Sequence, residues 1–400
     1  MDAYIADGVR TPIGNFGGTL APVRTDDLAA LVLKELLKRN EQLDAAAIGD
    51  VLMGCANQAG EDNRNVARMA LLLAAFPHMV PGETVNRLCA SGMAAAVNGA
   101  RMLACGDAEV VVAGGVEHMT RGPWVMSKAS KAFGRDSQLH DTSFGWRFVN
   151  PRLDEVYGTD GMGETAENLV DQYGISREDQ DAFAAWSQQK AAQSAAERGE
   201  ECISVSIPRR KQDPLVFSED EFVKPQTSAE GLSRLRPAFR PNGTVTAGNA
   251  SGLNDGAAAL LLASESGLAK HGLTAMTRIC SSAVVGVEPR IMGIGPVGAS
   301  RLALERAGLK LSDMDLIELN EAFAAQALAC TRMLGLDDFD PRVNPQGGAI
   351  ALGHPLGMTG ARLLLTASKQ LVRVNKRYAL VTLCIGVGQG YAVVLENMQR

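Results

Sequence analysis

The stretch Thr84-Val-Asn-Arg-Leu-Cys-Ala-Ser-Gly-Met-Ala-Ala-Ala96 joins an apolar run to a pattern of small residues typical of a helix. It therefore predicts a turn from strand to helix, with the thiol of Cys89 at the N-terminus of that helix. Unpaired N–H groups and the positive end of the helix dipole stabilise an anion, so we expect a lowered pKa for Cys89. We interpret Cys89 as a nucleophile, the alternative being a buried structural cysteine.

A similar plan recurs in the C-terminal part of the chain and predicts two related halves. In both copies a helical pattern leads into an apolar strand, over 31–54 in the first and 302–322 in the second. Further along, the turns at Cys89 and at His354 each follow a Val-Asn pair, so they occupy corresponding places. If the halves pack about a pseudo-two-fold axis, Cys89, His354 and Cys384 converge.

The order of the expected elements predicts an α/β fold with an insertion. Strands alternate with helical patterns in each half, which favours mostly parallel sheets covered by helices. The segment 119–249 holds all three Trp and is too long for a loop without structure of its own, so we predict an inserted lid subdomain. The expected division is 1–118 with 250–272 as the N-terminal half, 119–249 as the insertion and 273–400 as the C-terminal half.

Composition limits the classes of function. A chain of 400 residues, of which 46% are hydrophobic, can bury one large core or two fused ones. The formal net charge of -6 makes nucleic acid an improbable partner. Seven Cys without a Cys-x-x-Cys pair argue against a disulfide framework and against a metal site. We find neither a leader nor an apolar run of membrane-spanning length, so we expect a cytoplasmic protein that does not bind membranes.

Four motifs with chemically active residues follow one another along the chain: Asn86-Arg-Leu-Cys89-Ala-Ser-Gly92, Asn320-Glu-Ala-Phe323, Gly353-His354-Pro355 and Cys384-Ile-Gly386-Val-Gly388-Gln-Gly390. In these motifs the chain resembles the thiolase family, the acetyl-CoA C-acyltransferases, along essentially its whole length. The resemblance implies the thiolase fold, in which two βαβαβαββ-type halves pack as a layered α-β-α-β-α core with an inserted lid. The segments 54–68 and 141–150 look most like the 3-oxoadipyl-CoA thiolase branch.

The resemblance also implies roles for the motif residues. Cys89 attacks the 3-keto carbon and is acylated, His354 takes its proton, and Cys384 protonates the departing enolate and later deprotonates CoA. The N–H groups of Cys89 and Gly386 are implied as an oxyanion hole. For the enolate oxygen, the family implies His354 together with a water held by Asn320. The alternatives are that Cys384 only packs in the core and that Asn320 caps a helix.

Coenzyme A is implied as a substrate, and we expect no permanently bound cofactor. The resemblance carries CoA binding over to Met162, Lys224, Arg234, Ala247, Gly248, Ser251, Ala322 and Phe323, with Lys224 and Arg234 as candidate phosphate partners. Acetoacetyl-CoA thiolases commonly have His directly before the lid Met, whereas this chain has Gly161-Met162. They also have a Ser where this chain has Gly231. Both differences weigh against acetoacetyl-CoA as the substrate.

The main prediction is cleavage of 3-oxoadipyl-CoA by CoA into succinyl-CoA and acetyl-CoA through a cysteine acyl-enzyme. The alternatives within the family are an acetyl-CoA acetyltransferase acting on acetoacetyl-CoA and a general fatty-acid 3-ketoacyl-CoA thiolase. A decarboxylating 3-ketoacyl synthase would want His in place of Asn320. A cysteine hydrolase would leave Cys384 idle, and a lipid-binding scaffold would need neither cysteine.

The end of a 3-oxoadipyl chain is a carboxylate, which needs a cation or several N–H donors when it is buried. Arg147, beside Trp146 and Phe148, is our candidate partner. The alternative is that Arg147 makes a salt bridge within the lid or between subunits. For the assembly, the family implies a homotetramer built from dimers.

Overall fold

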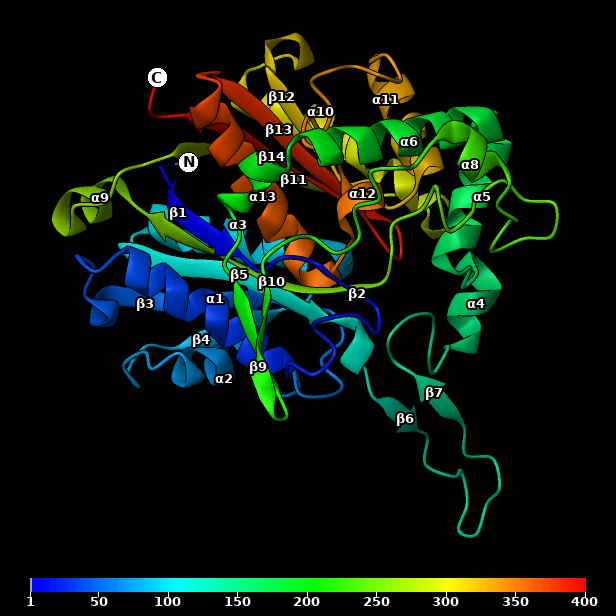
Figure 1. Cartoon of the computed structure of the whole chain (residues 1–400), viewed down its shortest axis with the longest axis horizontal. Helices are drawn as coiled ribbons and strands as arrows, with labels where there is room; N and C mark the ends of the chain where they lie inside the picture. Colours follow the sequence, from blue (N-terminus) through cyan, green and yellow to red (C-terminus); the bar gives the residue numbers. More distant parts are fainter. Residues whose placement is uncertain (1) are drawn as a thin grey trace.

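The computed structural model describes residues 2–400 and has one ten-stranded sheet running through it (Figure 1). The strand order is β12-β13-β14-β11-β1-β10-β5-β3-β4, with β2 beside β10. These strands are β1 (Tyr4–Arg10), β2 (Gly14–Asn15), β3 (Ile48–Gly54), β4 (Gly82–Val85), β5 (Val110–His118), β10 (Asn254–Ala263), β11 (Thr277–Gly286), β12 (Leu316–Leu319), β13 (Tyr378–Ile385) and β14 (Gln389–Asn397). Two half-sheets meet where β1 pairs with β11 at only two residue pairs.

Helices cover and separate the half-sheets. They are α1 (Thr25–Arg39), α2 (Val66–Leu73), α3 (Ser91–Cys105), α9 (Glu265–His271), α10 (Gly295–Ala307), α11 (Ala324–Leu334), α12 (Ala349–Leu352) and α13 (Leu356–Arg373). Short 3-10 turns precede two of these helices, η2 (Leu88–Ala90) before α3 and η4 (Pro289–Ile294) before α10. Two others precede strands, η1 (Ala45–Ala47) before β3 and η5 (Leu311–Asp313) before β12.

The strand order confirms the predicted duplication. The first half reads β4-β3-β5-β10-β1, and the second reads β12-β13-β14-β11, with an isolated parallel bridge between Ile317 and Val343 in the place of β4. The expectation of mostly parallel sheets is wrong, because among the named strands of residues 2–400 only the pairs β3–β4, β3–β5 and β12–β13 run parallel. β13 and β14 are joined by a tight turn, and strands joined in this way can only pair antiparallel.

The core is layered as the resemblance implied. α1 and α2 pack on the outer face of the first half-sheet, α10 and α11 on the outer face of the second, and α3 and α13 lie between them (Figure 1). Alternate residues of β5 show this arrangement, because Val111 and Ala113 face the central helices whereas Val110 and Val112 face α1 and α2. The layers therefore follow an α-β-α-β-α order.

Glycines allow the two central helices to cross closely. A Cβ at Gly92 in α3 would lie 2.5 Å from the carbonyl oxygen of Gly357 in α13, and a Cβ at Gly115 in β5 would lie 1.8 Å from the same atom. Gly92 and Gly357 are each three residues beyond the turns of Cys89 and His354. The crossing therefore brings both turns to one place in the middle of the molecule.

The central helix α3 also corrects one expectation about membranes. The span Leu88–Cys105 is long and apolar enough to meet a simple criterion for a membrane helix, and 61% of that window is buried. α3 packs between the two half-sheets. A helix that is buried on all sides is apolar all round, whether it lies in a protein core or in a membrane.

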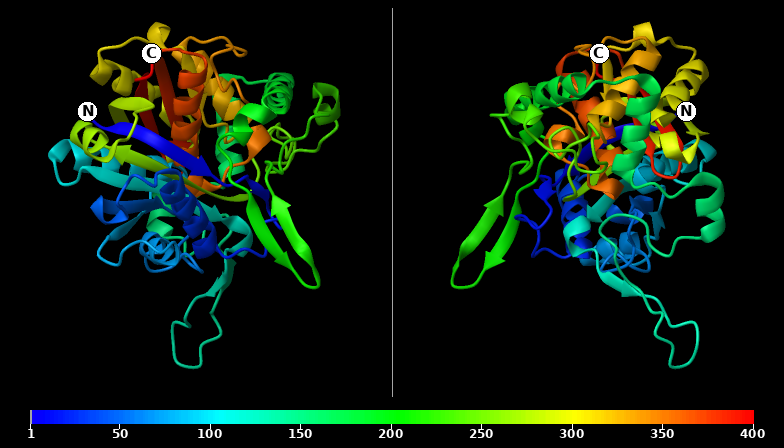
Figure 2. Two further views of the ribbon diagram at one scale, coloured as in Figure 1. Left: turned by 60° about the vertical axis from the view of Figure 1, so that its left-hand side comes forward. Right: turned by 90° about the vertical axis from the view of Figure 1, so that its right-hand side faces the viewer.

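The segment between β5 and β10 has structure of its own, although the residue division proposed from the sequence stays a prediction. It contains η3 (Met119–Arg121), β6 (Trp124–Met126), β7 (Leu139–Asp141), α4 (Pro151–Tyr157), α5 (Met162–Tyr173), α6 (Arg177–Gln193), α7 (Ala195–Gly199), β8 (Val205–Arg209), β9 (Gln212–Phe217) and α8 (Ala229–Ser233). The β6–β7 and β8–β9 hairpins extend away from the body of the molecule (Figure 2).

Candidate active site

Cys89 lies in the 3-10 turn that leads into α3, as the sequence predicted. Leu88 holds a positive φ of 47°, which is unusual for a side chain of its size and marks a strained turn. Ser91 fixes the turn, because its hydroxyl donates to the carbonyl of Leu88 at 2.7 Å and accepts the N–H of Arg87 at 2.9 Å. The strain and these bonds direct the Cys89 side chain into the interior.

The expected lowering of the Cys89 pKa is wrong for the unliganded protein. Burial raises the pKa of Cys89 to about 11, and the backbone N–H groups of Gly386 and of Cys89 itself oppose that rise only in part. Removal from water outweighs the helix terminus, because an anion in an apolar interior loses more hydration than two N–H groups replace. Cys89 is therefore a thiol at neutral pH and needs a base.

His354 has the form of a base. Its Nδ1 lies 2.7 Å from the hydroxyl of Thr359, whose only proton is donated to the carbonyl of Pro355 at 2.8 Å. The hydrogen-bond pattern therefore places a proton on Nδ1 and leaves Nε2 without one. Burial, helped by the guanidinium of Arg362, lowers the pKa of His354 to about 3, which keeps the ring neutral.

Asn320 faces the free nitrogen of His354. Its side-chain Nδ2 lies 3.4 Å from Nε2 of His354, and its backbone N–H donates to the carbonyl of Thr382. Within residues 2–400 its Oδ1 is buried without a hydrogen-bond partner. The alternative role as a helix cap is wrong, because α11 begins at Ala324 with Phe323 in the capping position.

Cys384 and Gly386 complete the cluster around Cys89. Cys384 lies fully buried on β13, and burial, together with nearby Cys89, raises its pKa well above the usual value, so it is a neutral proton donor. A Cβ on Gly386 would lie 3.4 Å from the Leu88 side chain and 3.6 Å from the sulfur of Met162. Met162, the first residue of α5, therefore covers the turn that carries Gly386.

Most of the residues predicted for CoA come together beside this cluster. The segment 247–251 is joined to Ala322 and Phe323 by a bridge from Ala250 to Phe323 and by the N–H of Ser251, which donates to the carbonyl of Ala322 at 3.0 Å. The side chains of Leu232 and Leu235 contact the backbone at Gly248. The predicted Ala247 is exposed next to this contact.

The two predicted phosphate partners are exposed on the insertion. The ammonium of Lys224 lies 5.0 Å from the ring centre of Phe222, and that ring packs against Gly252. Arg234 pairs with Glu230 at 2.5 Å on the surface of α8. Both cations are thus near the segment 247–251, with their charged groups in solvent.

Arg147 is held by neutral oxygens. Its guanidinium donates to the carbonyl of Thr142 at 3.5 Å and to Oδ1 of Asn57 at 3.3 Å, both at the long end of the hydrogen-bond range. Among residues 2–400 it forms no ion pair, so the alternative of a salt bridge within the lid is wrong. Its contact with substrate stays a prediction.

Sequence reasoning missed several supporting residues. Thr359 orients the His354 ring, and Asn254 accepts the backbone N–H of His354 at 2.9 Å. Only the closeness of Thr359 to His354 along the chain offered a signal, since Asn254 comes from the other half. Arg290 was also missed, and it lines a cavity together with Met162, Val387 and Trp146.

Comparisons with known proteins agree with this geometry. The family model for "Thiolase, N-terminal domain" matches residues 3–266, and that for "Thiolase, C-terminal domain" matches 273–397. The chain is 58% identical, over 99% of its length and 100% of the relative, to a 3-oxoadipyl-CoA/3-oxo-5,6-dehydrosuberyl-CoA thiolase of Escherichia coli. It is equally similar, over 99% of both chains, to a beta-ketoadipyl-CoA thiolase of Pseudomonas aeruginosa.

A solved structure also supports the fold over the whole chain. The crystal structure of the Bacillus anthracis acetyl-CoA acetyltransferase superposes with a TM-score of 0.91 at 41% identity and covers 99% of both chains. The two family models together span most of the chain, and the relatives match it over 99% of its length. Both findings assign the chain to the same family. The chain belongs to the thiolase family and is an acyltransferase that uses CoA as a substrate.

Proposed function

We propose that the protein is a 3-oxoadipyl-CoA thiolase, which cleaves 3-oxoadipyl-CoA with CoA into succinyl-CoA and acetyl-CoA. The observation that carries this proposal is the 58% identity, from end to end, to relatives named for that substrate. The acetyl-CoA acetyltransferase of solved structure is less similar, at 41% identity. The reverse reaction, condensation, uses the same residues.

We propose that the first half of the reaction runs from Cys89 to His354. Nε2 of His354 takes the thiol proton, and the sulfur bonds to C3 of the substrate. The bond between C2 and C3 then breaks, which leaves a succinyl thioester on Cys89 and the enolate of acetyl-CoA. The N–H groups of Cys89 and Gly386, which already face the sulfur, would hold the negative oxygen on C3.

Cys384 would give its proton to C2 of the enolate, because it is neutral and lies beside Cys89. The enolate oxygen would be held by the protonated His354 and by a water on Asn320, whose buried Oδ1 has no protein partner within residues 2–400. In the second half, the Cys384 thiolate takes the proton of CoA, the CoA sulfur attacks the thioester, and succinyl-CoA leaves. The proton on His354 then returns to Cys89.

These roles predict different results for the two cysteines. Acid quench after incubation with a 3-oxoacyl-CoA, followed by peptide mass mapping, should find the acyl group on Cys89. Cys384→Ser should still be acylated by acetyl-CoA but lose turnover by roughly 100-fold or more, because it lacks the enolate proton transfer. Acyl label that survives Cys89→Ala would contradict the nucleophile, and normal turnover of Cys384→Ser would leave Cys384 as packing.

The substrate is tested by thiolysis of acetoacetyl-CoA, 3-oxoadipyl-CoA and a medium-chain 3-oxoacyl-CoA. We expect the highest kcat/KM with 3-oxoadipyl-CoA. A charge-assisted bond of about 1.5 to 3 kcal/mol predicts that Arg147→Ala loses roughly 10- to 100-fold with this substrate and little with acetoacetyl-CoA. Arg290→Ala is the comparison, because Arg290 is an arginine that lines the cavity beside Met162 and Trp146.

The outcomes separate the alternatives. Equal losses of Arg147→Ala on both substrates would make Arg147 structural, and a selective loss in Arg290→Ala alone would assign the carboxylate to Arg290. A wild type that prefers acetoacetyl-CoA would support the acetyltransferase, and one that prefers the medium chain would support a general thiolase. Hydrolysis of the thioester without CoA would indicate a hydrolase.

We also propose a homotetramer built from dimers and a cytoplasmic location. The tetramer is supported by the β6–β7 hairpin, which leaves Trp124, Met126 and Phe133 exposed far from the core. Exposed apolar side chains gathered on one projection are typical of a contact between proteins. The cytoplasm is supported by cysteines such as Cys55, Cys89, Cys330 and Cys384, whose thiols form no disulfide within residues 2–400 and are preserved by a reducing compartment.

A further inference from the structure

Glu117 is a buried acid on β5 that the proposed mechanism does not use. Its side chain is 2% exposed. Glu117 lies on the face of β5 that carries Val111 and Ala113, which pack against the central helices. Its side chain therefore points toward α13.

The carboxylate of Glu117 accepts three backbone N–H groups. Oε2 accepts from Gly357 at 2.8 Å and from Ala56 at 3.0 Å, and Oε1 accepts from Asn57 at 3.0 Å. Gly357 lies in the first turn of α13, directly after the turn of His354. Pro355, at the capping position of α13, provides no side-chain acceptor, so Glu117 satisfies an N–H group that a capping residue usually satisfies.

The same carboxylate is linked to the turn of Cys89. Ala56, whose N–H it accepts, uses its carbonyl to accept the side-chain N–H of Asn86 at 3.1 Å. Oδ1 of Asn86 in turn accepts the N–H of Leu88 at 2.9 Å. One buried acid thus connects the residue before Cys89 with the helix after His354, which belong to different halves of the molecule.

We propose that Glu117 is a positioning residue, which sets the place of the His354 turn relative to the Cys89 turn. It does not touch the reacting atoms, so it acts through the two backbone segments that it holds. This inference rests on the proposed function of His354 as the base for Cys89.

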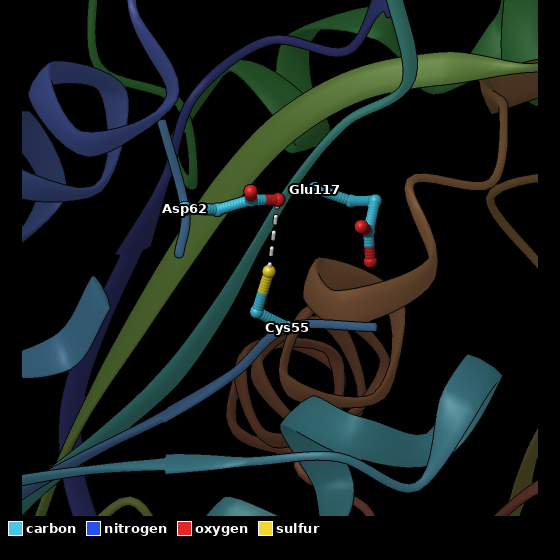
Figure 3. Close-up of side chains that lie close together, drawn as sticks. All are labelled: Cys55, Asp62 and Glu117. Atoms are coloured by element: carbon cyan, nitrogen blue, oxygen red, sulfur yellow. Dashed lines mark hydrogen bonds between the residues drawn. The ribbon is translucent and has the colours of Figure 1, made fainter. Parts of the chain in front are cut away.

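The neighbours of Glu117 do not suggest another role. Cys55 and Asp62 lie beside it, and the Cys55 thiol donates to Asp62 at 3.5 Å (Figure 3). Asp62 accepts the N–H groups of Gln58 and Gly60, so backbone donors point at both carboxylates. Each oxygen of the two carboxylates already accepts at least one backbone N–H group, and we therefore interpret the cluster as a hydrogen-bonded turn.

The test is the rate at which iodoacetamide alkylates Cys89, with kcat measured in parallel. Glu117→Gln keeps the size of the side chain but turns one acceptor into an NH2 group that faces N–H donors. We expect alkylation and kcat to fall together by roughly 10-fold or more, with KM changed less than threefold. Asp62→Asn is the matched control from the same cluster, and it should lower the melting temperature but keep the alkylation rate within threefold.

His354→Asn is run first, because it must slow the alkylation if His354 is the base. If it does not, the proposed mechanism fails, whatever Glu117 does. If it does, equal losses in Glu117→Gln and Asp62→Asn, or a wild-type alkylation rate in Glu117→Gln, would overturn the positioning role. If Glu117→Gln does not fold, Asn86→Ala replaces it in the test, because Asn86 forms the other end of the connection and lies near the surface. A wild-type alkylation rate in Asn86→Ala would likewise overturn the positioning role of Glu117.

Discussion

His354 and Cys89 are neutral partners in the free protein for one physical reason. Burial disfavours charge on both, so it lowers the pKa of the imidazole to about 3 and raises that of the thiol to about 11. The ion pair of thiolate and imidazolium is therefore a minor species before substrate binds. In the mechanism we propose, transfer of the proton becomes favourable as the sulfur bonds to carbon, because the negative charge then moves to an oxygen held by N–H groups.

The low pKa of His354 predicts how stability depends on pH. Between about 6.5 and 3 the unfolded chain binds a proton on this ring and the folded protein does not, so the free energy of unfolding falls as pH drops through this range. Comparing urea unfolding of the wild type and His354→Asn at several pH values isolates this contribution. The raised pKa values of Glu117 and Glu318 act in the opposite direction and cancel in the comparison.

A difference between wild type and variant that stays constant from pH 7 to pH 4 would contradict a buried neutral His354.

The sequence predicted where these residues lie better than how they are charged. The strand-to-helix pattern and the Val-Asn pairs located the turns of Cys89 and His354, because these signals are local. The pKa of Cys89 depends on burial by β13 and on the N–H of Gly386, almost 300 residues away. A local pattern contains no such information, so the helix dipole was given too much weight.

At the scale of elements, the crossing of α3 and α13 decides the site. Helices usually approach to 8–10 Å, and glycines at the contact allow the closer approach that the Cys89 and His354 turns require. Strand direction, in contrast, was predicted wrongly. Alternation of strands with helices indicates crossover connections and therefore parallel pairing. β10 and β14 instead pair antiparallel with β5 and β13. The sequence did not reveal this, because buried strands of either direction have the same apolar pattern.

Adding a methyl group where β5 packs against α13 should cost stability. A Cβ at Gly115 meets backbone of α13, which cannot move as a side chain would, so we expect Gly115→Ala to destabilise by about 1–3 kcal/mol or more. Gly199→Ala is the control, because its Cβ meets nothing within 4 Å and α7 favours Ala over Gly. The midpoints of urea unfolding measure both, and an unchanged midpoint for Gly115→Ala would show that α13 can move away from β5 freely.

At the scale of the whole molecule, the insertion carries the surfaces that differ from the duplicated core. The sequence located it through length and Trp content, but it did not reveal that two hairpins project from the body (Figure 2). An exposed hairpin has few contacts that fix its direction, and its apolar residues resemble a core pattern. The exposed fraction of Phe133, which is complete, is visible only in three dimensions.

Charges on the β6–β7 hairpin should disrupt the assembly. We expect the double variant Trp124→Asp, Phe133→Asp to change the mass in light scattering from tetramer to dimer, because buried charges without partners are costly. Leu73→Asp, at a residue on α2 that is 54% exposed, is the control and should keep the tetramer. A double variant that stays tetrameric would exclude the hairpin as the contact, and a dimeric wild type would contradict the tetramer itself.

The position of β1 has a consequence for protein synthesis. This strand lies between β10 and β11, so the ribosome makes it long before either neighbour exists. β1 ends at Arg10 and β10 begins at Asn254, with the whole insertion made between them. During this interval the nascent chain carries a strand whose two edges are unpaired, and unpaired strand edges favour aggregation. The first half therefore cannot complete its sheet until the middle of the chain has left the exit tunnel, and we expect β1 to remain unpaired until then.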